Sequence, residues 1–359
     1  MGKEIRIDWE KAFVGIMLGT AVGDAIGLPT EGISRRRIRR MHKGVLKHRL
    51  AFGRGMISDD TEHAFHVTQA LVKNGDDMEA FAKSLGWKLR LWFLCLPPGL
   101  GMATLKSCVK LWLGFSPKKS GVFSAGNGPA MRSAMIGAYF HDDAKLMEKA
   151  VGISTRISHT DPKAETGALA VARLAAVAVE NGAGKSPDIG QTAAMLKGLP
   201  LADNEWIERI GKLEKAFDEK LSVLQFADSL GLAKGVTGYI YDTVPVVIYA
   251  WLRHYGDYAA TIKSVIECGG DTDTIGAIAG ALAGAVTGQG GIPRKWIEGI
   301  SDWPLSVRVL KEAAVRLAMK KCGAEVGPVG DFWFLTPLRN LFLLGVVLAH
   351  GFRRLLPPY

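Results

Sequence analysis

Cysteine is scarce in this chain. Its 359 residues include only Cys95, Cys108, Cys268 and Cys322, and no pair of them has the spacing of a zinc site or of a disulfide framework. A small fold held together by cross-links is therefore excluded. Reduced thiols fit a cytoplasmic protein best, so the cytoplasm is the expected location.

Signals for targeting and for β-structure are missing as well. The first residues, MGKEIRIDWE, mix charged and apolar side chains and lack the apolar core of a secretion signal. Arg6 occupies the position where a myristoylation motif carries serine or threonine. The alternation of apolar and polar residues that is typical of half-buried strands is nearly absent, and no repeat or low-complexity linker divides residues 1–325.

Acidic residues are outnumbered by basic ones. Lysine and arginine total 45 against 35 for aspartate and glutamate, so the formal net charge is +10, in a chain whose 48% hydrophobic residues are typical of a globular protein. The excess suggests an acidic partner, such as a phosphorylated ligand or an acidic protein surface. Much of it lies between Arg35 and Arg49, where a solvated loop or helix face is the simpler explanation. Nucleic acid is compatible with the charge, but no nucleic-acid fold signature accompanies it.

Helical periodicity dominates what is present. Capping residues and apolar spacing predict a helix from Trp9 to about Gly23, a second from Thr61 to Asn74, and a third that begins in a capping box of Asp76 and Glu79. Further helices are predicted at 102–113, 129–140, 143–156, 163–180, 188–197, 204–218, 223–231, 243–255, 258–267, 274–287 and 305–321. The expected fold is all-α, with one compact multi-helix bundle over residues 1–325 and an apolar C-terminal extension over 326–359.

Two stretches carry glycine at every fourth position. Residues 268–288 read CGGDTDTIGAIAGALAGAVTG, and residues 15–27 read GIMLGTAVGDAIG. A glycine inside a helix costs about 0.5–1 kcal/mol relative to alanine, so these rows indicate close approach of another backbone. We expect the two helices to pack together and to bring their acids into proximity. Membrane helices with a small-residue face are the alternative, but Lys11 and Asp24 leave the first apolar run too short for a span.

The C-terminal extension is apolar. From Asp331 it reads DFWFLTPLRNLFLLGVVLAHGFRRLLPPY, and its longest charge-free run, 340–352, is too short to span a bilayer. It can pack on the domain as a final helix or associate with another copy. It can also lie on a membrane surface with Arg353 and Arg354 toward the headgroups, or bind a partner. The amino-acid sequence does not decide among these arrangements.

Two acidic motifs precede predicted helices: SDDT at 58–61 and DTDT at 271–274. Each motif by itself is explained as a helix cap. Together, four carboxylates and several hydroxyls form an all-oxygen set that suits two hard cations, Mg²⁺ or Mn²⁺, about 3.5–4 Å apart. Two preceding glycines are expected to hold Asp271 and Asp273 in non-helical geometry, with Asp273 or Thr274 as the helix cap.

Two polar motifs are candidates for substrate binding. SAGNGP at 124–129 opens a predicted helix, and its glycines would leave backbone N–H groups free for a phosphate at the helix N-terminus, although an ordinary turn explains the motif as well. In SHTDP at 158–162, His159 lies in a polar turn where it can meet a substrate hydroxyl. A lone histidine is more often a hydrogen-bonded structural residue.

In order along the chain, these motifs resemble those of the ADP-ribosylglycohydrolase family, the relatives of dinitrogenase-reductase-activating glycohydrolase. The resemblance covers about residues 10–300 and rests on GTAVGDAIGLPTE, SDDT, SAGNGPAMR, SHTDPKA and GGDTDTIGAIAGALAGA, of which the SDDT and GGDTDT pair is the specific part. It implies an all-α fold, a binuclear Mg²⁺ or Mn²⁺ centre, and removal of ADP-ribose from modified side chains, chiefly arginine. It says nothing about the chain after about residue 325.

The resemblance also implies roles for particular residues. The family's metal-binding positions correspond to Ser58, Asp59, Asp60, Asp271, Asp273 and Thr274. Its substrate-binding positions correspond to Ser124, Gly126, Asn127 and Gly128 around the ADP-ribose phosphates and to His159 at the ribose. Glu31 matches a glutamate on a mobile loop near the metals, and with Asp59 and Asp60 it forms the implied catalytic set. Ser58 stands where many members have threonine, a change that keeps the hydroxyl.

The implied reaction is hydrolysis of an N-glycosidic bond. The ribose diol binds the two ions, Asp59 or Asp60 assists proton transfer, and water attacks the anomeric carbon. The substrate would be an ADP-ribosylated protein, and hydrolysis would reverse an ADP-ribosyltransferase such as a toxin. An alternative of a different class is an immunity protein that blocks such a toxin by direct contact through its basic segment or its apolar tail. An inert family member is disfavoured because the acidic motifs are intact.

Overall fold

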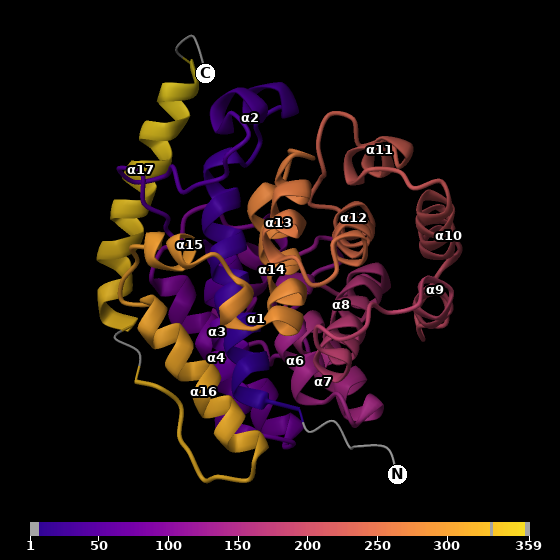
Figure 1. The fold of residues 1–359 in the computed structure, drawn as a ribbon. Coiled ribbons are helices and arrows are strands. Elements are labelled where there is room, and N and C mark those ends of the chain that lie inside the picture. Colours follow the sequence, from indigo (N-terminus) through magenta and orange to yellow (C-terminus); the bar gives the residue numbers. More distant parts are fainter. Residues whose placement is uncertain (1–6, 331–332, 356–359) are drawn as a thin grey trace.

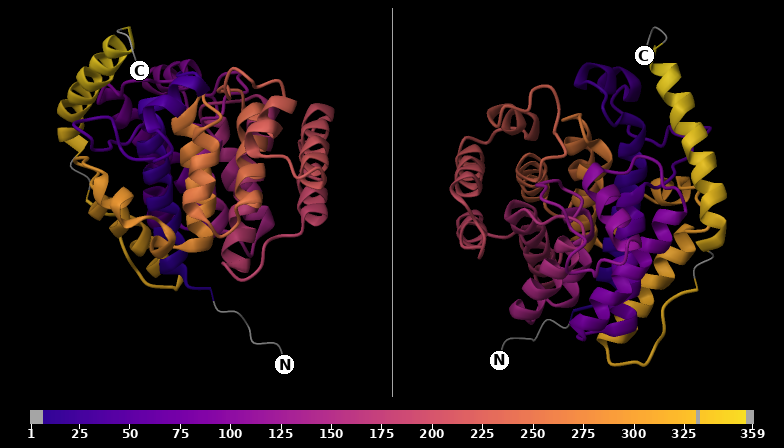
Figure 2. Two further views of the ribbon diagram at one scale, coloured as in Figure 1. Left: turned by 45° about the horizontal axis from the view of Figure 1, so that its top comes forward. Right: turned by 180° about the vertical axis from the view of Figure 1, so that it is seen from behind.

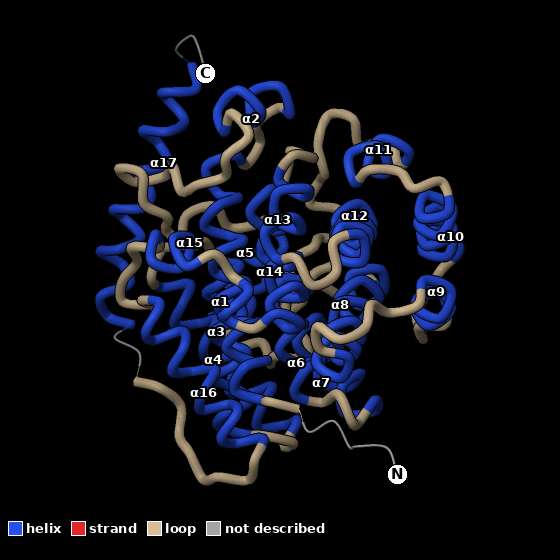
Figure 3. The backbone as a smooth tube through the Cα atoms, in the orientation of Figure 1, coloured by secondary structure: helices blue, strands red, loops and turns tan. Residues whose placement is uncertain are grey.

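The computed structural model describes residues 7–330 and 333–355, and its regular secondary structure there is helical. Figure 3 shows helices and loops and no strand in this part of the chain, where five isolated bridges join residues across loops. The cysteines are all free, so no disulfide joins the elements. The all-α prediction is confirmed.

The arrangement of the helices is shown in Figures 1 and 2. The α-helices are α1 Trp9–Gly27, α2 Arg35–His42, α3 Asp59–Asn74, α4 Met78–Leu94, α5 Met102–Trp112, α6 Ala134–Tyr139, α7 Ala144–Arg156, α8 Pro162–Asn181, α9 Ile189–Lys197, α10 Asn204–Asp218, α11 Val223–Ser229, α12 Ile240–Arg253, α13 Tyr258–Ile266, α14 Thr272–Thr287, α15 Arg294–Gly299, α16 Val307–Lys321 and α17 Thr336–Leu355. The short 3₁₀ turns are η1 Leu28–Thr30, η2 Ala130–Arg132, η3 Gln289–Gly291 and η4 Trp333–Leu335.

Helices α1 and α14 lie side by side at the centre of the molecule (Figure 1). Their glycines face one another: a Cβ atom added to Gly19 would lie 2.1 Å from the carbonyl oxygen of Gly280, and one added to Gly280 would lie 2.1 Å from that of Gly19. Gly15 meets Gly284 in the same way, so the two helices run antiparallel. The predicted packing of two glycine-ridged helices is confirmed.

Helix α1 is a core helix. Among the described residues, one segment, Trp9–Thr30, is long and apolar enough to cross a membrane, with a mean hydropathy of 1.5. Its most apolar window is entirely buried inside the protein. Helices α3, α8, α13 and α16 pack around the α1–α14 pair, and the apolar side chains of these helices form one continuous core. The predicted choice of a core helix over a membrane helix is confirmed.

Several predicted helix ends are wrong by a few residues. Helix α1 continues past Gly23 to Gly27, whose missing side chain leaves room for the carbonyl oxygen of Thr272. Helix α14 begins at Thr272, so Asp273 has helical geometry, and the predicted cap is also wrong. Asp271 occupies the N-cap position instead. Gly269 and Gly270, with their positive φ angles, form the turn by themselves, and the helix cap follows directly at Asp271.

Two other predicted helix starts are corrected. The carboxylate of Asp77, not that of Asp76, accepts the backbone N–H groups of Glu79 and Ala80 at the start of α4. The predicted helix 129–140 is a 3₁₀ turn, η2, followed by the short helix α6. The glycine-rich loop therefore does not end at a regular α-helix N-terminus.

The basic stretch forms helix α2. Ile38 is its buried apolar contact, and Arg36, Arg37 and Arg40 are exposed around it. The guanidinium of Arg35 is anchored to Asp228 and to backbone carbonyl groups. A solvated helix face, the simpler explanation of the charge cluster, describes most of this segment.

Helix α17 packs along one side of the domain as a final helix (Figure 2). Four of its described residues, Thr336, Arg339, Asn340 and Leu343, are buried against the domain. Leu343 lies in a small apolar cluster with Leu50 and Met56. Association with another copy, with a membrane surface or with a partner would use the opposite side of this helix. The domain boundary near residue 325 stays a prediction.

Candidate active site

The acidic and polar motifs meet at one cavity of about 510 Å³. The lining includes the predicted residues Glu31, Asp59, Asp60, Ser124, Gly126, Asn127, Gly128, His159, Asp271, Asp273 and Thr274. Ser58 lies just behind it, where its hydroxyl donates to Asp60 Oδ2 at 3.1 Å. All of the residues that the motifs single out are therefore brought together, although they come from segments far apart in the sequence.

The first acidic motif is held by α1. Ser58 is the N-cap of α3, and its hydroxyl accepts the backbone N–H of Asp60 at 3.2 Å. The carboxylate of Asp24 accepts the backbone N–H of Ser58 at 2.8 Å and the hydroxyl of Thr61 at 2.5 Å. Asp24 is fully buried and lies in the glycine row of α1. Sequence reasoning noticed this acid but did not place it at the site.

The second acidic motif depends on two glycines. Gly269 and Gly270 have φ angles of 69° and 85°, and a Cβ atom on Gly270 would lie 2.0 Å from the carbonyl oxygen of Val236. Only glycine fits this approach. After this turn, Asp271 Oδ2 accepts the side-chain amide of Asn127 at 2.7 Å, and Thr274 Oγ1 donates to Asp60 Oδ2 at 3.2 Å. The starts of α3 and α14 are thus directly connected.

The carboxylates of the site lack a compensating cation from the described lining of the cavity, which contains neither lysine nor arginine. Burial, assisted by the charges of Glu62 and Asp24, raises the pKa of Asp59 to about 8. Burial and neighbouring acids also raise the pKa values of Asp60 and Asp273 well above the ordinary range. The acids therefore repel one another unless protons or cations neutralise them.

The oxygen atoms of the site are the type of ligand that a hard cation prefers. Asp60 Oδ1 is buried without a hydrogen-bond partner, whereas Oδ2 accepts two hydroxyls. Carboxylate and hydroxyl oxygens are the ligands that Mg²⁺ and Mn²⁺ prefer. In the described part of the chain no three acidic, histidine or cysteine side chains already converge as a closed metal cage. An ion would therefore have to draw these carboxylates closer together.

His159 faces the glycine loop as a neutral ring. Its Nδ1 lies 2.8 Å from the hydroxyl of Ser158, which accepts a hydrogen bond from the guanidinium of Arg132 at 2.7 Å. The serine hydroxyl itself donates to the carbonyl oxygen of Thr155 at 3.4 Å, and the Nε2 atom of the histidine ring lies on the side of Gly126. Burial and the charge of Arg132 lower the pKa of His159 to about 3. The neutral ring can form one hydrogen bond into the cavity through Nε2, and it does not act as an acid near neutral pH.

The glycine loop differs from the predicted phosphate cradle. The backbone N–H of Gly126 donates to the hydroxyl of Ser124 at 3.3 Å, and that of Asn127 donates to the carbonyl oxygen of Gly238 at 3.0 Å. The N–H of Gly126, which was expected to be free, is thus engaged inside the protein, and so is that of its neighbour Asn127. Gly99, Gly101 and the first three residues of α5 also line the cavity, and no sequence motif pointed to them.

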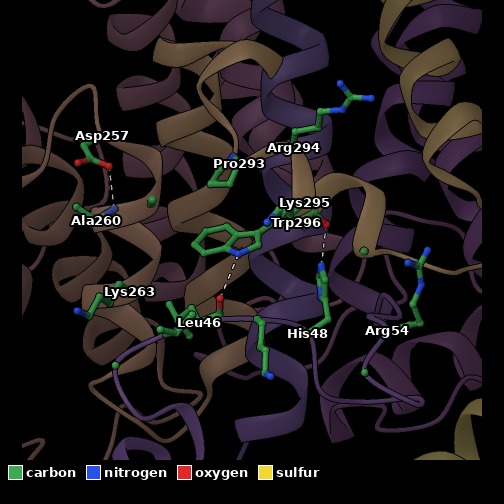
Figure 4. A pocket seen from close by; sticks show the side chains of 16 residues that line it. Leu46, His48, Arg54, Asp257, Ala260, Lys263, Pro293, Arg294, Lys295 and Trp296 are labelled. Carbon is green, nitrogen blue, oxygen red and sulfur yellow. Dashed lines mark hydrogen bonds between the residues drawn. The ribbon is translucent and has the colours of Figure 1, made fainter.

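The basic segment contributes to a different and larger cavity of about 820 Å³ (Figure 4). The indole ring of Trp296 lies in its middle and donates to the carbonyl oxygen of Leu46 at 3.3 Å. Lysine and arginine side chains surround it, and Asp257, whose oxygen accepts the N–H of Ala260, is the single carboxylate of the described lining. None of the predicted site residues lines this cavity, which lacks the oxygen set of the acidic site.

The arginine of the tail supports the acidic site from behind. The Nε–H group of Arg339 donates to Asp302 Oδ1 at 2.9 Å. Its Nη2 group donates to Asp302 Oδ2 at 2.7 Å and to the carbonyl oxygen of Ile57 at 2.5 Å. Its Nη1 donates to Glu62 at 3.2 Å and to Asn340 at 2.9 Å. Asp302 in turn accepts the backbone N–H of Ile57 at 2.9 Å. Both backbone polar groups of the residue before Ser58 are therefore fixed, a contact that the sequence motifs did not indicate.

Comparison with known proteins agrees with the assembled motifs. The family model for ADP-ribosylglycohydrolase matches residues 6–326. ADP-ribosylhydrolase ARH3 of Gallus gallus is 27% identical over 340 residues, which cover 79% of this chain and 87% of that protein. The ADP-ribosyl-[dinitrogen reductase] glycohydrolase of Rhodospirillum rubrum is 26% identical over 324 residues, 85% of this chain and 95% of that protein.

A solved structure gives the same result for the fold. An ADP-ribosylglycohydrolase-related protein complex contains a chain that superposes with a TM-score of 0.59 at 22% identity and covers 88% of this chain and 99% of its own. The family match spans the segments that carry every motif residue of the cavity. The chain belongs to the ADP-ribosylglycohydrolase family, which consists of hydrolases that remove ADP-ribose from proteins.

Proposed function

We propose that the protein is a metal-dependent hydrolase that removes ADP-ribose from modified arginine side chains and so reverses an ADP-ribosyltransferase, for example a toxin. The observation that carries the proposal is the cluster of buried carboxylates around the unpartnered Asp60 Oδ1, in a cavity without lysine or arginine among its described lining residues. Such a cluster is unfavourable by itself and is expected to take up cations.

Two ions, Mg²⁺ or Mn²⁺, would be held by Ser58, Asp59, Asp60, Asp271, Asp273 and Thr274. When bound, they would supply positive charge that polarises the ribose and the water beside it. Asn127 supports this set because its amide holds Asp271 Oδ2 in place. Ser58 and Thr274 orient the Asp60 carboxylate through their hydroxyls.

The remaining chemistry belongs to the chain itself. Asp59 or Asp60 accepts a proton from the attacking water, whose oxygen bonds to the anomeric carbon as the carbon–nitrogen bond breaks. The leaving guanidine nitrogen takes up a proton, so the products are free ADP-ribose and an unmodified arginine. His159 Nε2 can form a hydrogen bond with a ribose hydroxyl, as donor or as acceptor according to the tautomer, because the ring stays neutral.

Arginine is supported as the linked residue by the charge at the rim. Glu31 is exposed at the edge of the cavity and belongs to its lining. A carboxylate there can pair with the planar guanidinium of a target arginine. The immunity role by direct contact stays a prediction, and a metal-site variant separates it from hydrolysis because that variant should still bind a toxin.

The test is release of free ADP-ribose from an ADP-ribosyl-arginine protein, with Mg²⁺, with Mn²⁺ and with chelator. We expect metal-dependent release by the wild type and a loss of about a thousandfold in Asp60→Asn, because a ligand and a proton acceptor are lost together. Asp76→Asn, an exposed acid on the next loop, is the matched control and should keep full activity. Full turnover by Asp60→Asn in metal-replete buffer would falsify the proposal, and release only from serine or nucleic-acid conjugates would correct the linkage.

A further inference from the structure

Helix α17 turns more apolar surface outward than toward the domain. Its domain-facing side carries the buried polar residues Arg339 and Asn340 beside the apolar residues Leu343 and Val346, and His350 Nε2 donates to the carbonyl oxygen of Leu50 at 2.7 Å. Its outward side consists of apolar residues. A surface helix normally turns its apolar stripe inward and its polar face to water, so this helix is built to present an apolar face.

The exposed side chains are large. Leu341 is 56% exposed, Leu348 51% and Phe352 68%. Asn340 donates to the carbonyl oxygen of Cys95 at 2.8 Å and so places the end of α4 beside the helix. We call the combined area the tail surface, and it comprises Leu94, Leu96, Leu338, Leu341, Phe342, Leu344, Leu348 and Phe352, all of them exposed. A contiguous apolar area of this kind marks an interaction site.

The charges near the tail surface are of one sign. No aspartate or glutamate occurs among the described residues from Phe334 to Leu355. Helix α2 lies near the C-terminal end of α17 in all the views of Figures 1 and 2, and the contact of His350 with Leu50 ties the two regions together. Every charged side chain from Gly32 to Ser58 is basic. The apolar face is therefore flanked by a positive segment.

We propose that the tail surface docks on an anionic lipid bilayer. Helix α17 would lie in the plane of the membrane interface with its leucine and phenylalanine side chains among the acyl chains, and the exposed arginines of α2 would meet the lipid phosphates. A second copy of the chain fits less well, because a symmetric contact would bring like charges at Arg36, Arg37 and Arg40 toward one another. The inference centres on α17, which follows the family match of residues 6–326, and does not rest on the proposed function.

The test uses the full-length protein and vesicle flotation. We expect binding to vesicles of phosphatidylcholine with about one quarter phosphatidylglycerol, weak binding to phosphatidylcholine alone, and a decrease with added salt because exposed charges are screened. The double variant Leu341→Glu/Leu348→Glu should lower the partition coefficient by about tenfold or more, since two leucines that would be buried in the bilayer are lost. The triple variant Arg36→Ala/Arg37→Ala/Arg40→Ala should lower it for anionic vesicles and remove most of the salt dependence.

A matched control variant tests whether the effect is specific to the tail surface. Leu201→Glu/Ile207→Glu replaces two exposed apolar residues in and near α10, away from the tail surface, and should bind vesicles like the wild type. All four proteins should release ADP-ribose from a soluble substrate equally, so a failure of the membrane inference is distinguishable from a failure of the hydrolase proposal. The replaced residues are exposed, so folding should be retained, which circular dichroism checks.

Two outcomes would overturn the inference. One is the absence of binding to anionic vesicles at low salt. The other is a concentration-dependent dimer, seen by light scattering, that Leu341→Glu/Leu348→Glu converts to a monomer while vesicle binding is absent in both proteins. That second result would assign the tail surface to another copy of the chain.

Discussion

Two neighbouring groups of buried acids in this protein differ in whether a side-chain cation neutralises them. Behind the site, Glu62 and Asp302 share the guanidinium of Arg339, whose five N–H groups all have acceptors. At the site, Asp60 and Asp273 are buried among further carboxylates, and the described lining of the cavity contains neither lysine nor arginine. The two groups lie on either side of the first turn of α3.

The difference separates a structural group of acids from a functional one. Where the chain supplies its own cation, the charges are paired permanently and an added ion has no place to bind. Where it supplies none, the acids keep a high affinity for protons and for imported cations. The predictions below change one side of this comparison at a time.

The largest effect is expected at the paired group. Arg339→Met leaves two buried carboxylates without their cation and the carbonyl of Ile57 without the guanidinium donor, which should lower the free energy of unfolding by about 3–5 kcal/mol. Urea denaturation measures it. Adding Glu62→Gln and Asp302→Asn should restore part of the loss, because the uncompensated charges are then gone. Arg294→Met, which breaks an ion pair of an exposed side chain, is the control and should change little.

The glycine contact that brings the site together comes next. Gly19→Ala inserts a methyl group 2.1 Å from a carbonyl oxygen of α14, and we expect a loss of about 3 kcal/mol or failure to fold. Gly211→Ala in α10 is the matched control, because nothing lies within 4 Å of the added methyl. It should stabilise the protein by about 0.5–1 kcal/mol. Equal effects of the two substitutions would contradict the close contact.

Metal addition should act on the unpaired group alone. At an ion concentration about a hundredfold above the dissociation constant, Mg²⁺ or Mn²⁺ should stabilise the wild type by about 2.7 kcal/mol. Asp273→Asn should raise the stability of the metal-free protein, since a repelling charge is removed, and should abolish the metal increment. Calorimetric titration with either ion measures the affinity directly, and an unchanged increment in Asp273→Asn would show that the ion binds elsewhere.

A smaller effect is expected from pH. The raised pKa values of Asp59, about 8, and Asp24, about 7, mean that the folded metal-free protein holds protons that the unfolded chain releases near its ordinary carboxylate pKa. This contribution to stability is complete below that ordinary value and is lost as the pH rises through about 7 to 8. The melting temperature in chelator should therefore fall by a few degrees, about 5 °C, between pH 6 and 9. Saturating Mg²⁺ should reduce this fall in melting temperature. A melting temperature that rises with pH in chelator would contradict the prediction.

The sequence predicted which residues meet at the cavity more accurately than it predicted where the helices around it begin. The two acidic motifs and the glycine rows lead to one cavity because helix capping and close helix packing leave clear local signatures, as at Ser58 and Gly280. The start of α14 was misplaced by two residues, because Thr272 and Asp273 suit a loop as well as a helix, and the positive φ of Gly270 alone does not decide between them.

Contacts between individual polar groups of distant segments were beyond sequence reasoning. The role of Asp24 depends on a hydrogen bond across 34 positions to Ser58, and that of Arg339 on contacts across more than 200 positions to Ile57 and Glu62. The N–H of Gly126 was expected to be free, but the hydroxyl of Ser124 accepts it, and the carbonyl of Gly238 accepts the N–H of Asn127 across a loop that no pattern places there. Such pairings depend on how the helices stack.

The amino-acid sequence by itself determined most of the helices, their central glycine-on-glycine pair and the all-oxygen chemistry of the site, because periodicity, glycine spacing and donor type are local properties. Only the tertiary structure decided which acids receive a cation from the chain and which do not, and which side of α17 faces outward. Both depend on burial and on distances between segments far apart in the chain, and the same Arg339 would be an ordinary surface arginine if α17 were not packed on the start of α3.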